Sequence, residues 1–246
     1  MRICAIVPTY DNPITVAAVV RILREHLGEV IVVDDGGGQE AREVLDRLST
    51  LDGVALVRRQ RNGGKGAAVK TGLERAAQLG ATHALQVDAD GQHDLRDVPK
   101  FVEAIRAHPE ALVLGAPRFD SSAPLVRRFG RKLTQFWNRI ETLGHVIDDP
   151  MCGFRVYPVT EALTSRTVGN AMDFDPEIVV RLAWAGVPVI NLETQVRYLV
   201  PEEGGVSHFR MLRDNLLIAW MHTRMVLRLL TLVWSRPWPR RMELHG

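Results

Sequence analysis

The sequence predicts an α/β fold in which helices cover both faces of a mostly parallel β-sheet. Short runs of β-branched and apolar residues recur along the first half of the chain, and segments with helical spacing of apolar residues separate them. Strands joined in this way are linked by crossovers, which place helices on both faces of the sheet. The 246 residues, of which 46% are hydrophobic, are enough for a large buried core.

The N-terminal residues provide the first strand and helix of this pattern. Residues 3–7 are an apolar run that ends at Pro8, which predicts a buried strand. Residues 11–13 (Asp-Asn-Pro) are typical of a helix start, because a cap residue precedes a proline that fits the first turn. Apolar residues follow at helical spacing: Val16, Val19, Val20, Leu23 and Leu27.

The same alternation continues toward the C-terminus. Further strands are predicted at residues 30–33, 54–57, 84–87 and 111–115, and further helices at 40–48 and from Gly63–Gly66 to Ala77. The segment 212–234 is apolar but interrupted by charges, so it is too polar to span a membrane. We therefore expect one domain over residues 1–210 and an amphipathic C-terminal segment over residues 211–246.

Composition and cysteine usage narrow the possible classes. The net charge of +2 is too small to indicate a nucleic-acid partner, and we expect none. Cys4 and Cys152 lie far apart in the sequence, which favours reduced thiols in a reducing compartment. Met1 leads directly into the short run that ends at Pro8, which does not resemble a signal peptide. We expect a cytoplasmic location.

Polar residues follow three of the predicted strands, at positions 8–11, 34–35 and 88–90. Ligands of such sheets bind outside the carboxyl ends of the strands. Asp88 and Asp90 point to the same side of their strand, and their carboxylates repel unless a cation lies between them. A hard divalent cation that also binds phosphate oxygens fits this pair, and a polar loop without a ligand is the alternative.

Residues 63–66 add a possible anion site, because the amides of a helix start, together with Lys65, attract negative charge. Ala67 stands where a phosphate-binding loop carries Ser or Thr, so this is not that motif. No Gly-x-Gly-x-x-Gly follows the first strand, which disfavours a dinucleotide-binding domain. Asp34 or Asp35 could accept hydrogen bonds from a base or a ribose.

Four segments together resemble the family 2 glycosyltransferases of the GT-A fold. They are residues 7–12, 32–36, 61–67 and 88–93, and they occur in the family's order and spacing. The form Asp-Ala-Asp-Gly-Gln-His, together with residues 149–157, most resembles the polyprenyl- or dolichyl-phosphate sugar synthases. The resemblance implies a GT-A Rossmann-like sheet and an inverting transfer from a nucleotide-sugar.

The resemblance also implies roles for individual residues. The implied nucleotide-binding residues are Pro8, Tyr10, Asp11, Asp34, Asp35, Lys65, Asp88 and Ala89. The implied ligands of Mg²⁺ or Mn²⁺ are Asp88, Asp90 and Gln92. Such a cation neutralises charge that develops on the leaving nucleoside diphosphate. The implied catalytic residues are Asp90 and Asp175.

Asp175 has two interpretations. A hydroxyl acceptor needs a general base, and Asp175 lies at about the family's position for it. Asp175 also precedes Pro176, as an N-cap of a helix over residues 177–185 would. A phosphate acceptor is already an anion at pH 7 and needs no strong base, so Asp175 would then only orient the sugar or the metal.

The acceptor side is inferred from basic residues. Arg118 and Arg131 lie about where the resembled synthases bind phosphate, in a run of mixed basic and apolar residues that favours an interfacial helix near anionic lipid. A solvated helix face is the alternative. In the resembled family, a Gly-x-Ser-basic stretch at the place of Ser207 and His208 closes over the donor diphosphate. Lys is usual at the place of His208, and Arg210 could supply the charge instead.

The C-terminal segment supports the same interpretation. Five of its apolar residues can share one side of a helix: Leu216, Leu217, Trp220, Leu227 and Leu230. Trp234, Arg236, Trp238, Arg240 and Arg241 follow as aromatic and cationic anchors. The segment is predicted to lie in the plane of a membrane interface, and the alternative is a helix packed on the domain or on a second subunit in a homo-oligomer.

These inferences combine into one predicted function. The chain is expected to transfer a sugar from a GDP- or UDP-sugar to a polyprenyl phosphate or other lipid-linked acceptor, on the anionic inner face of the cytoplasmic membrane. Two alternatives stay open: a family 2 glycosyltransferase with a soluble hydroxyl acceptor, and a catalytically idle GT-A-like domain that binds at the membrane.

Overall fold

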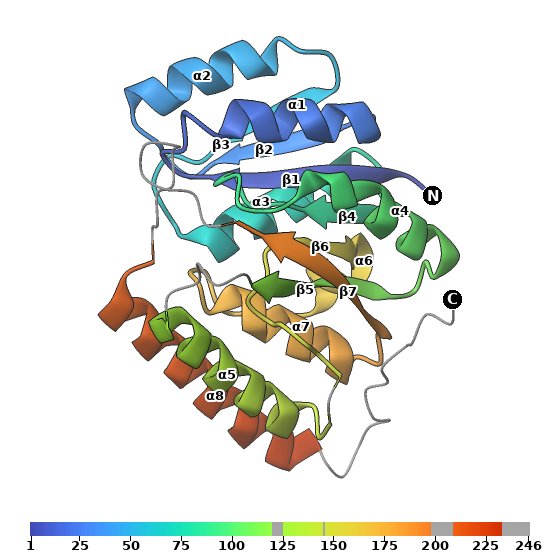
Figure 1. Ribbon diagram of the computed structural model, residues 1–246, viewed down its shortest axis with the longest axis vertical. Coiled ribbons are helices and arrows are strands. Elements are labelled where there is room, and N and C mark those ends of the chain that lie inside the picture. Colours follow the sequence, from blue (N-terminus) through green and yellow to red (C-terminus); the bar gives the residue numbers. More distant parts are fainter. Residues whose placement is uncertain (120–124, 145, 198–208, 233–246) are drawn as a thin grey trace.

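The computed structural model describes residues 1–119, 125–144, 146–197 and 209–232. Within these ranges, seven strands form a sheet with the order β3-β2-β1-β4-β6-β5-β7 (Figure 1). β6 is antiparallel to both of its neighbours, and the other pairings are parallel. The predicted α/β fold with a mostly parallel sheet is confirmed.

The elements alternate as the sequence predicts. The strands are β1 (Ile3–Thr9), β2 (Val30–Asp34), β3 (Val54–Arg58), β4 (His83–Gln86), β5 (Leu112–Phe119), β6 (Arg155–Pro158) and β7 (Val189–Val196). The helices are α1 (Val16–His26), α2 (Gln39–Ser49), α3 (Lys65–Gln78), the 3₁₀ turn η1 (Leu95–Asp97), α4 (Val98–Ala107), α5 (Leu125–Glu141), α6 (Val159–Thr164), α7 (Phe174–Trp184) and α8 (Met211–Leu232).

The start of α1 differs from the prediction. The helix begins at Val16 rather than at residues 11–13, because Asp11 has a left-handed backbone with φ of 49°. The Oδ1 atom of Asp11 accepts a hydrogen bond of 2.6 Å from the amide of Gly38, at the start of α2. The Asp-Asn-Pro segment therefore shapes a loop at the edge of the sheet instead of capping the helix.

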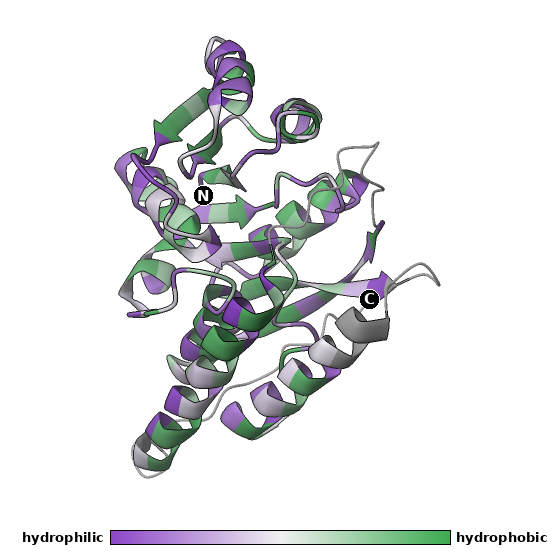
Figure 2. Cartoon of the chain, turned by 90° about the vertical axis from the view of Figure 1, so that its left-hand side faces the viewer, coloured by the Kyte–Doolittle hydropathy of each residue, from purple (hydrophilic) through white to green (hydrophobic). Residues whose placement is uncertain are grey.

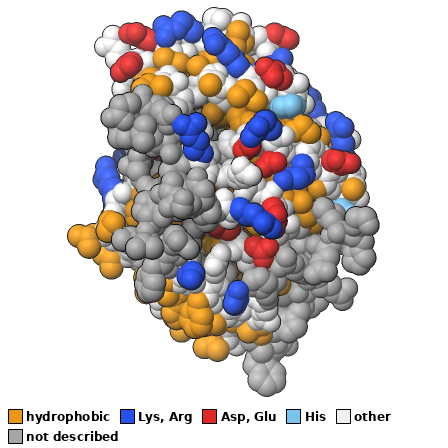
Figure 3. Space-filling model, viewed as in Figure 1, with side chains coloured by type: hydrophobic (Ala, Val, Ile, Leu, Met, Phe, Trp, Pro, Cys, Tyr) orange, Lys and Arg blue, Asp and Glu red, His pale blue; other side chains and the backbone are white. Residues whose placement is uncertain are grey.

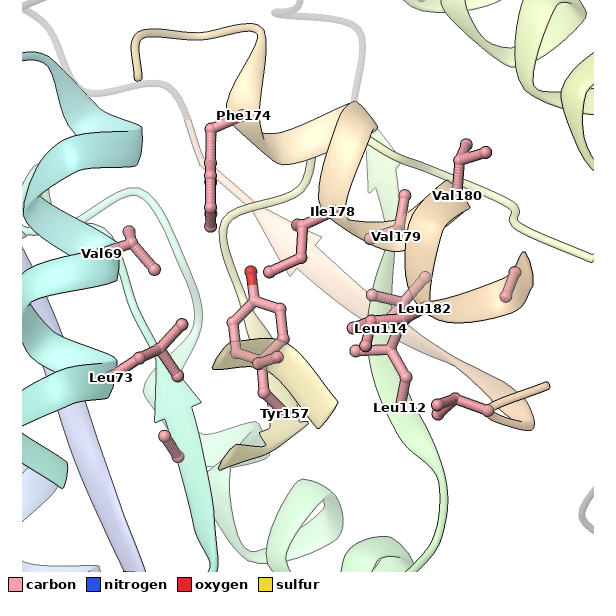
Figure 4. Close-up of a cluster of buried hydrophobic side chains, with 14 of the residues drawn as sticks. Val69, Leu73, Leu112, Leu114, Tyr157, Phe174, Ile178, Val179, Val180 and Leu182 are labelled. Atoms are coloured by element: carbon pink, nitrogen blue, oxygen red, sulfur yellow. The ribbon is translucent and has the colours of Figure 1, made fainter. Parts of the chain in front are cut away.

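Helices cover both faces of the sheet, as expected, and side chains that alternate along β1 enter two separate cores. Cys4 and Ile6 pack with residues of α3, α6 and α7, whereas Ala5 and Val7 pack with residues of α1 and α4. Figure 4 shows the first core, in which Tyr157 of β6 and Phe174 of α7 lie near Val69 of α3. Figure 2 shows hydrophobic residues along the strands, as expected for strands that are covered on both faces. Both cysteines are buried thiols that are not joined in a disulfide.

The helices α5 and α8 lie beside α7, away from the centre of the sheet (Figure 1). One face of α8 is buried and contributes Ile218, Met221, Met225 and Leu229 to the first core. A hydrogen bond of 2.7 Å joins Nδ1 of His222 in α8 to Oε1 of Glu141 in α5. The ring of His222 also stacks on Trp137. Among the helices that the structure describes, none combines the length and the hydropathy that a membrane span requires.

Candidate active site

The three polar clusters that follow strands in the sequence come together at one edge of the sheet. β2, β1 and β4 are neighbours and parallel, so residues 34–35, 9–11 and 88–92 lie at the same carboxyl edge. Because β6 is antiparallel, its N-terminal end reaches this edge as well and brings Gly153 and Arg155 to it. The sheet order thus assembles a polar site from segments that are far apart in the sequence.

Lys65 is at the centre of this site. Its Nζ atom lies 2.7 Å from Oδ2 of Asp88 and 2.7 Å from Oδ2 of Asp175, so one ammonium group joins β4 to α7. Burial of Lys65 lowers its pKa, but the carboxylates of Asp175 and Asp88 outweigh burial and raise the pKa above the ordinary lysine value. Lys65 therefore carries a fixed positive charge into the site.

Asp88 and Asp90 have different environments. Burial raises the pKa of Asp88, but Lys65 and the ring of His93 more than offset this and hold it well below the usual range. The pKa of Asp90 is raised, first by burial and then by the negative charge of Asp88. Asp88 is therefore held as an anion, whereas Asp90 gains most from an additional cation.

A metal ion that is shared with a diphosphate fits these residues. The Oδ1 atom of Asp88 is buried and has no hydrogen-bond partner among the described residues. Buried carboxylate oxygens normally have a partner, and a bound cation would supply one. In the part of the chain that the structure describes, no three His, Cys, Asp or Glu side chains gather as a metal site. Mg²⁺ commonly binds one or two carboxylates and takes its other ligands from substrate phosphates and water, so an all-protein site is not required.

Asp175 is buried and lies between two cations. The Nη2 atom of the fully buried Arg155 is 3.6 Å from Oδ1 of Asp175, and Lys65 is on the other oxygen. α7 begins at Phe174 with Asp173 at its N-cap, so the interpretation of Asp175 as the N-cap is wrong. Asp175 lies within the first turn, where its carboxylate faces Lys65 instead of the helix amides.

Asp34 and Asp35 already have partners in the protein. Asp34, at the end of β2, accepts a hydrogen bond of 2.8 Å from the amide of Gly37. Asp35 binds the guanidinium of Arg59 at 2.7 Å and accepts hydrogen bonds from the amides of Gly63 and Gly64. These bonds hold the loop before α3 in place, and contact of either carboxylate with a nucleotide stays a prediction.

The other predicted nucleotide-binding residues lie at the ends of β1 and β4. Pro8 is a buried residue of β1, and Tyr10 and Asp11 are half-buried just beyond it. Ala89 is buried between the two aspartates, and its carbonyl accepts a hydrogen bond of 2.6 Å from Thr15 Oγ1. The amide of Gln92 donates to Asp90 Oδ1 at 3.1 Å, which fixes the turn that follows β4.

The predicted acceptor residues are only partly described. Arg118, near the end of β5, is exposed and forms an ion pair with Glu193 of β7. Arg131 belongs to α5, but its side chain lies outside the described part, as do Ser207 and His208. The amide of the exposed Arg210 donates a hydrogen bond of 2.7 Å to Asp214 at the start of α8. The acceptor roles of these five residues stay predictions.

Two residues of the site, Gly153 and Arg155, lie in the stretch 149–157, for which the resemblance implies no role. Arg155 donates hydrogen bonds to the carbonyls of Pro150, Cys152 and Asp175, and so fixes the loop before β6 to the start of α7. A Cβ atom at Gly153 would overlap the carboxylate of Asp88. The signal in the sequence was an arginine at the start of a short apolar strand, two residues after a glycine.

The comparison with protein families identifies the class of this protein. Residues 4–160 match the model of glycosyl transferase family 2, and the chain belongs to this family. The chain is therefore a glycosyltransferase with a GT-A fold, and the resemblance inferred from its four motifs is confirmed.

Individual relatives point to one branch of the family. The chain is 27% identical, over 62% of its length and 67% of the relative's, to the UDP-N-acetylglucosamine–dolichyl-phosphate N-acetylglucosaminyltransferase of Methanococcus voltae. It is also 27% identical, over 64% of its length and 66% of the relative's, to the undecaprenyl-phosphate mannosyltransferase of Micrococcus luteus. These names match the polyprenyl-phosphate sugar synthases, the branch that the sequence resembles.

A solved structure shows the same fold. Glucosyl-3-phosphoglycerate synthase of Mycobacterium tuberculosis, in complex with Mn²⁺, UDP-glucose and phosphoglyceric acid, has a TM-score of 0.66 to this chain at 16% identity. The match covers 99% of this chain and 88% of the other. At this identity the comparison supports the fold alone.

Proposed function

We propose that this glycosyltransferase moves a sugar from a nucleotide-sugar, with GDP or UDP as the leaving group, to a polyprenyl phosphate or another lipid-linked acceptor. The proposed place is the inner face of the cytoplasmic membrane. The observation that carries the proposal is the ammonium of Lys65 between Asp88 and Asp175, at the carboxyl edge of the sheet. The names of the relatives, which act on dolichyl and undecaprenyl phosphates, support the acceptor class.

The proposed reaction is a direct displacement that inverts the anomeric carbon. An oxygen of the acceptor phosphate forms the new bond to that carbon, the bond to the donor diphosphate breaks, and the nucleoside diphosphate leaves with the electron pair. Asp88, Asp90 and Gln92 would hold Mg²⁺ or Mn²⁺. When bound, this cation neutralises charge on the leaving diphosphate.

The chain's own groups have defined tasks in this proposal. Lys65 supplies a fixed positive charge beside the donor, and Asp175 orients Lys65 from the opposite side. Arg155 holds the backbone of Asp175 in place. A phosphate acceptor arrives as an anion, so the site needs no group that removes a proton from it.

A soluble hydroxyl acceptor is the second candidate. The observation that favours it is the buried carboxylate of Asp175, because a hydroxyl acceptor must lose its proton to a base within reach. The two candidates share the donor site and differ in the acceptor and in what Asp175 does.

Binding of nucleoside diphosphates tests the donor site. We expect one of GDP or UDP to raise the melting temperature of the wild-type chain in the presence of Mn²⁺, because a ligand that binds the folded state stabilises it by mass action. Asp90→Ala should lose the Mn²⁺-dependent part of this shift. A folded wild-type chain that no nucleoside diphosphate stabilises would contradict both acceptor candidates and favour an idle binding domain.

A further inference from the structure

The helix α8 has two apolar faces, and only one of them packs on the protein. Its inner face buries Ile218, Met221, Met225 and Leu229. On the opposite side, apolar residues recur at helical spacing and are exposed, with Leu212 at 83% and Trp220 at 60%. This outer row consists of Leu212, Leu216, Trp220, Leu227 and Leu230. Packing within the domain explains the inner face but not the outer one.

The neighbouring helix α5 shows the same arrangement. Leu133 and Phe136 are about half exposed, on the side of the helix opposite the buried Asn138. The two helices are held together by the His222–Glu141 hydrogen bond. In Figure 3, hydrophobic side chains lie over the start of α8 and along α5, at the lower left and bottom of the molecule. The two outer faces thus belong to one side of the protein, which we call the α5/α8 surface.

The charges on these two helices have one sign. Among their described side chains, the exposed charged residues are all basic: Lys132, Arg139, Arg213 and Arg228. The acidic residues Glu141 and Asp214 are buried. Apolar side chains flanked by long basic ones are suited to the boundary between lipid head groups and acyl chains, where the charged ends reach the phosphates.

We propose that the α5/α8 surface docks the enzyme on an anionic lipid bilayer. This inference rests on the proposed lipid-linked acceptor, and it assigns the membrane contact to one surface made by both helices. A second copy of the chain fits less well, because a symmetric interface would bring like charges together. An anionic leaflet instead satisfies both the apolar rows and the basic side chains.

The docked arrangement would bring the membrane close to α7, the helix that carries Asp175. Arg224, on the side of α8, lies 3.3 Å from Glu177 of α7, and Glu177 is two residues beyond Asp175. α8 is therefore fixed directly on the helix that carries Asp175.

Vesicle binding of the full chain tests the proposal. Co-sedimentation with phosphatidylcholine vesicles should be weak, and phosphatidylglycerol in the vesicles should strengthen it in a way that added salt reverses. The double variants Leu216→Ser/Trp220→Ser and Arg213→Glu/Arg228→Glu should each bind the anionic vesicles at least about tenfold more weakly.

Matched controls carry the same changes elsewhere on the surface. Ile14→Ser/Leu51→Ser removes two exposed apolar residues, and Arg21→Glu/Arg47→Glu reverses two exposed charges, all outside α5 and α8. The apolar control should bind the vesicles as the wild type does. The charge control should weaken binding less than Arg213→Glu/Arg228→Glu. Melting temperatures should stay close to wild type in all four variants.

Two results would overturn the proposal. One is a folded wild-type chain that does not bind anionic vesicles, and the other is equal loss of binding in test and control variants. In the first case, a dimer in analytical ultracentrifugation that Leu216→Ser/Trp220→Ser dissociates would assign the surface to a second copy of the chain. Binding of nucleoside diphosphates is measured separately, in the absence of vesicles. A chain that binds vesicles but no nucleoside diphosphate would contradict the proposed function and still support the docking surface.

Discussion

The Nζ atom of Lys65 lies 2.7 Å from Oδ2 of Asp175, and this ion pair joins the first residue of α3 to the first turn of α7. The same ammonium group binds Asp88 at the end of β4. Three segments that lie far apart in the sequence thus share one charge. The proposed donor site therefore depends on Lys65 both for its shape and for its electrostatic balance.

Replacing Lys65 by methionine should damage stability and activity together. Lys65→Met leaves the carboxylates of Asp88 and Asp175 without their shared cation, and losing one partner of a buried ion pair costs about 3 kcal/mol. For a chain of this size this corresponds to a melting temperature lower by about 10 °C. Sugar transfer should fall at least about 100-fold, since a fixed charge near the leaving group is lost.

Lys100→Met is the matched control for this change. Lys100 also pairs with a carboxylate, that of Asp97 at 3.1 Å, but its side chain is 42% exposed. Surface pairs contribute less than about 1 kcal/mol, so this variant should melt and react nearly as the wild type does. Equal behaviour of Lys65→Met and Lys100→Met would contradict the role assigned to Lys65.

Asp175→Asn should separate the two acceptor candidates. With a phosphate acceptor no proton is removed, so the variant should keep Mn²⁺-dependent nucleotide binding and lose about tenfold in transfer through a weaker contact to Lys65. Loss of a general base costs more, about 10²–10⁴-fold. Transfer rates to the acceptor that the wild type uses decide between the two, and Asp173→Asn, at the N-cap of the same helix, should change the rate little.

Gly153→Ala should disturb the metal and donor site without unfolding the protein. The added Cβ atom overlaps the carboxylate of Asp88, which must move away from Lys65 and from its place beside Asp90. We expect Mn²⁺-dependent nucleotide binding to weaken at least about tenfold, as for a lost charged hydrogen bond. Calorimetric titration with the nucleotide and Mn²⁺ measures this. In the same titration, Gly28→Ala, where nothing lies within 4 Å of the added atom, should bind the nucleotide as the wild type does. Unchanged binding by Gly153→Ala would show that Asp88 is not needed where the structure places it.

Local patterns predicted most of the fold because they depend on neighbouring residues. The strands β1 to β5 and the helices α2 and α3 lie where apolar runs and helical spacing place them. The direction of β6 depends instead on its two partner strands, and its four residues begin with the buried Arg155, which no apolar pattern indicates. The predicted start of α1 was wrong because it also depends on a distant contact. Asp11 accepts a hydrogen bond from the amide of Gly38 instead of from the nearby amides.

The site was predictable as a set of residues but not as an arrangement. The motifs identified Asp88, Asp90 and Lys65, and the order of β2, β1 and β4 then brought their segments together. The contact between Lys65 and Asp175 spans much of the chain, and no spacing rule in the sequence encodes it. The bonds from Asp35 to the loop before α3 are equally non-local.

Glu177→Gln should make stability less sensitive to acid. The carboxylate of Glu177 is buried, which raises its pKa, but the amides of Gly169 and Val168 and the charge of Arg181 lower it below the usual value. A lowered pKa in the folded state stabilises the protein fully above the ordinary glutamate pKa of about 4.3, and this contribution is lost as pH falls through the folded-state value. Removing one partner of such a buried pair costs about 3 kcal/mol at pH 7.

Chemical denaturation at pH 7 and at about pH 3.5, below the ordinary glutamate pKa, measures this prediction. The free energy of unfolding of the wild type should fall more between these pH values than that of Glu177→Gln, so the difference between the two proteins narrows in acid. Glu193→Gln removes a glutamate that also pairs with an arginine, Arg118, but at the exposed edge of the sheet. Its effect should stay below about 1 kcal/mol at both pH values. A constant difference between wild type and Glu177→Gln across this range would mean that Glu177 stabilises the contact between α7 and α8 by packing, and that its charge contributes nothing.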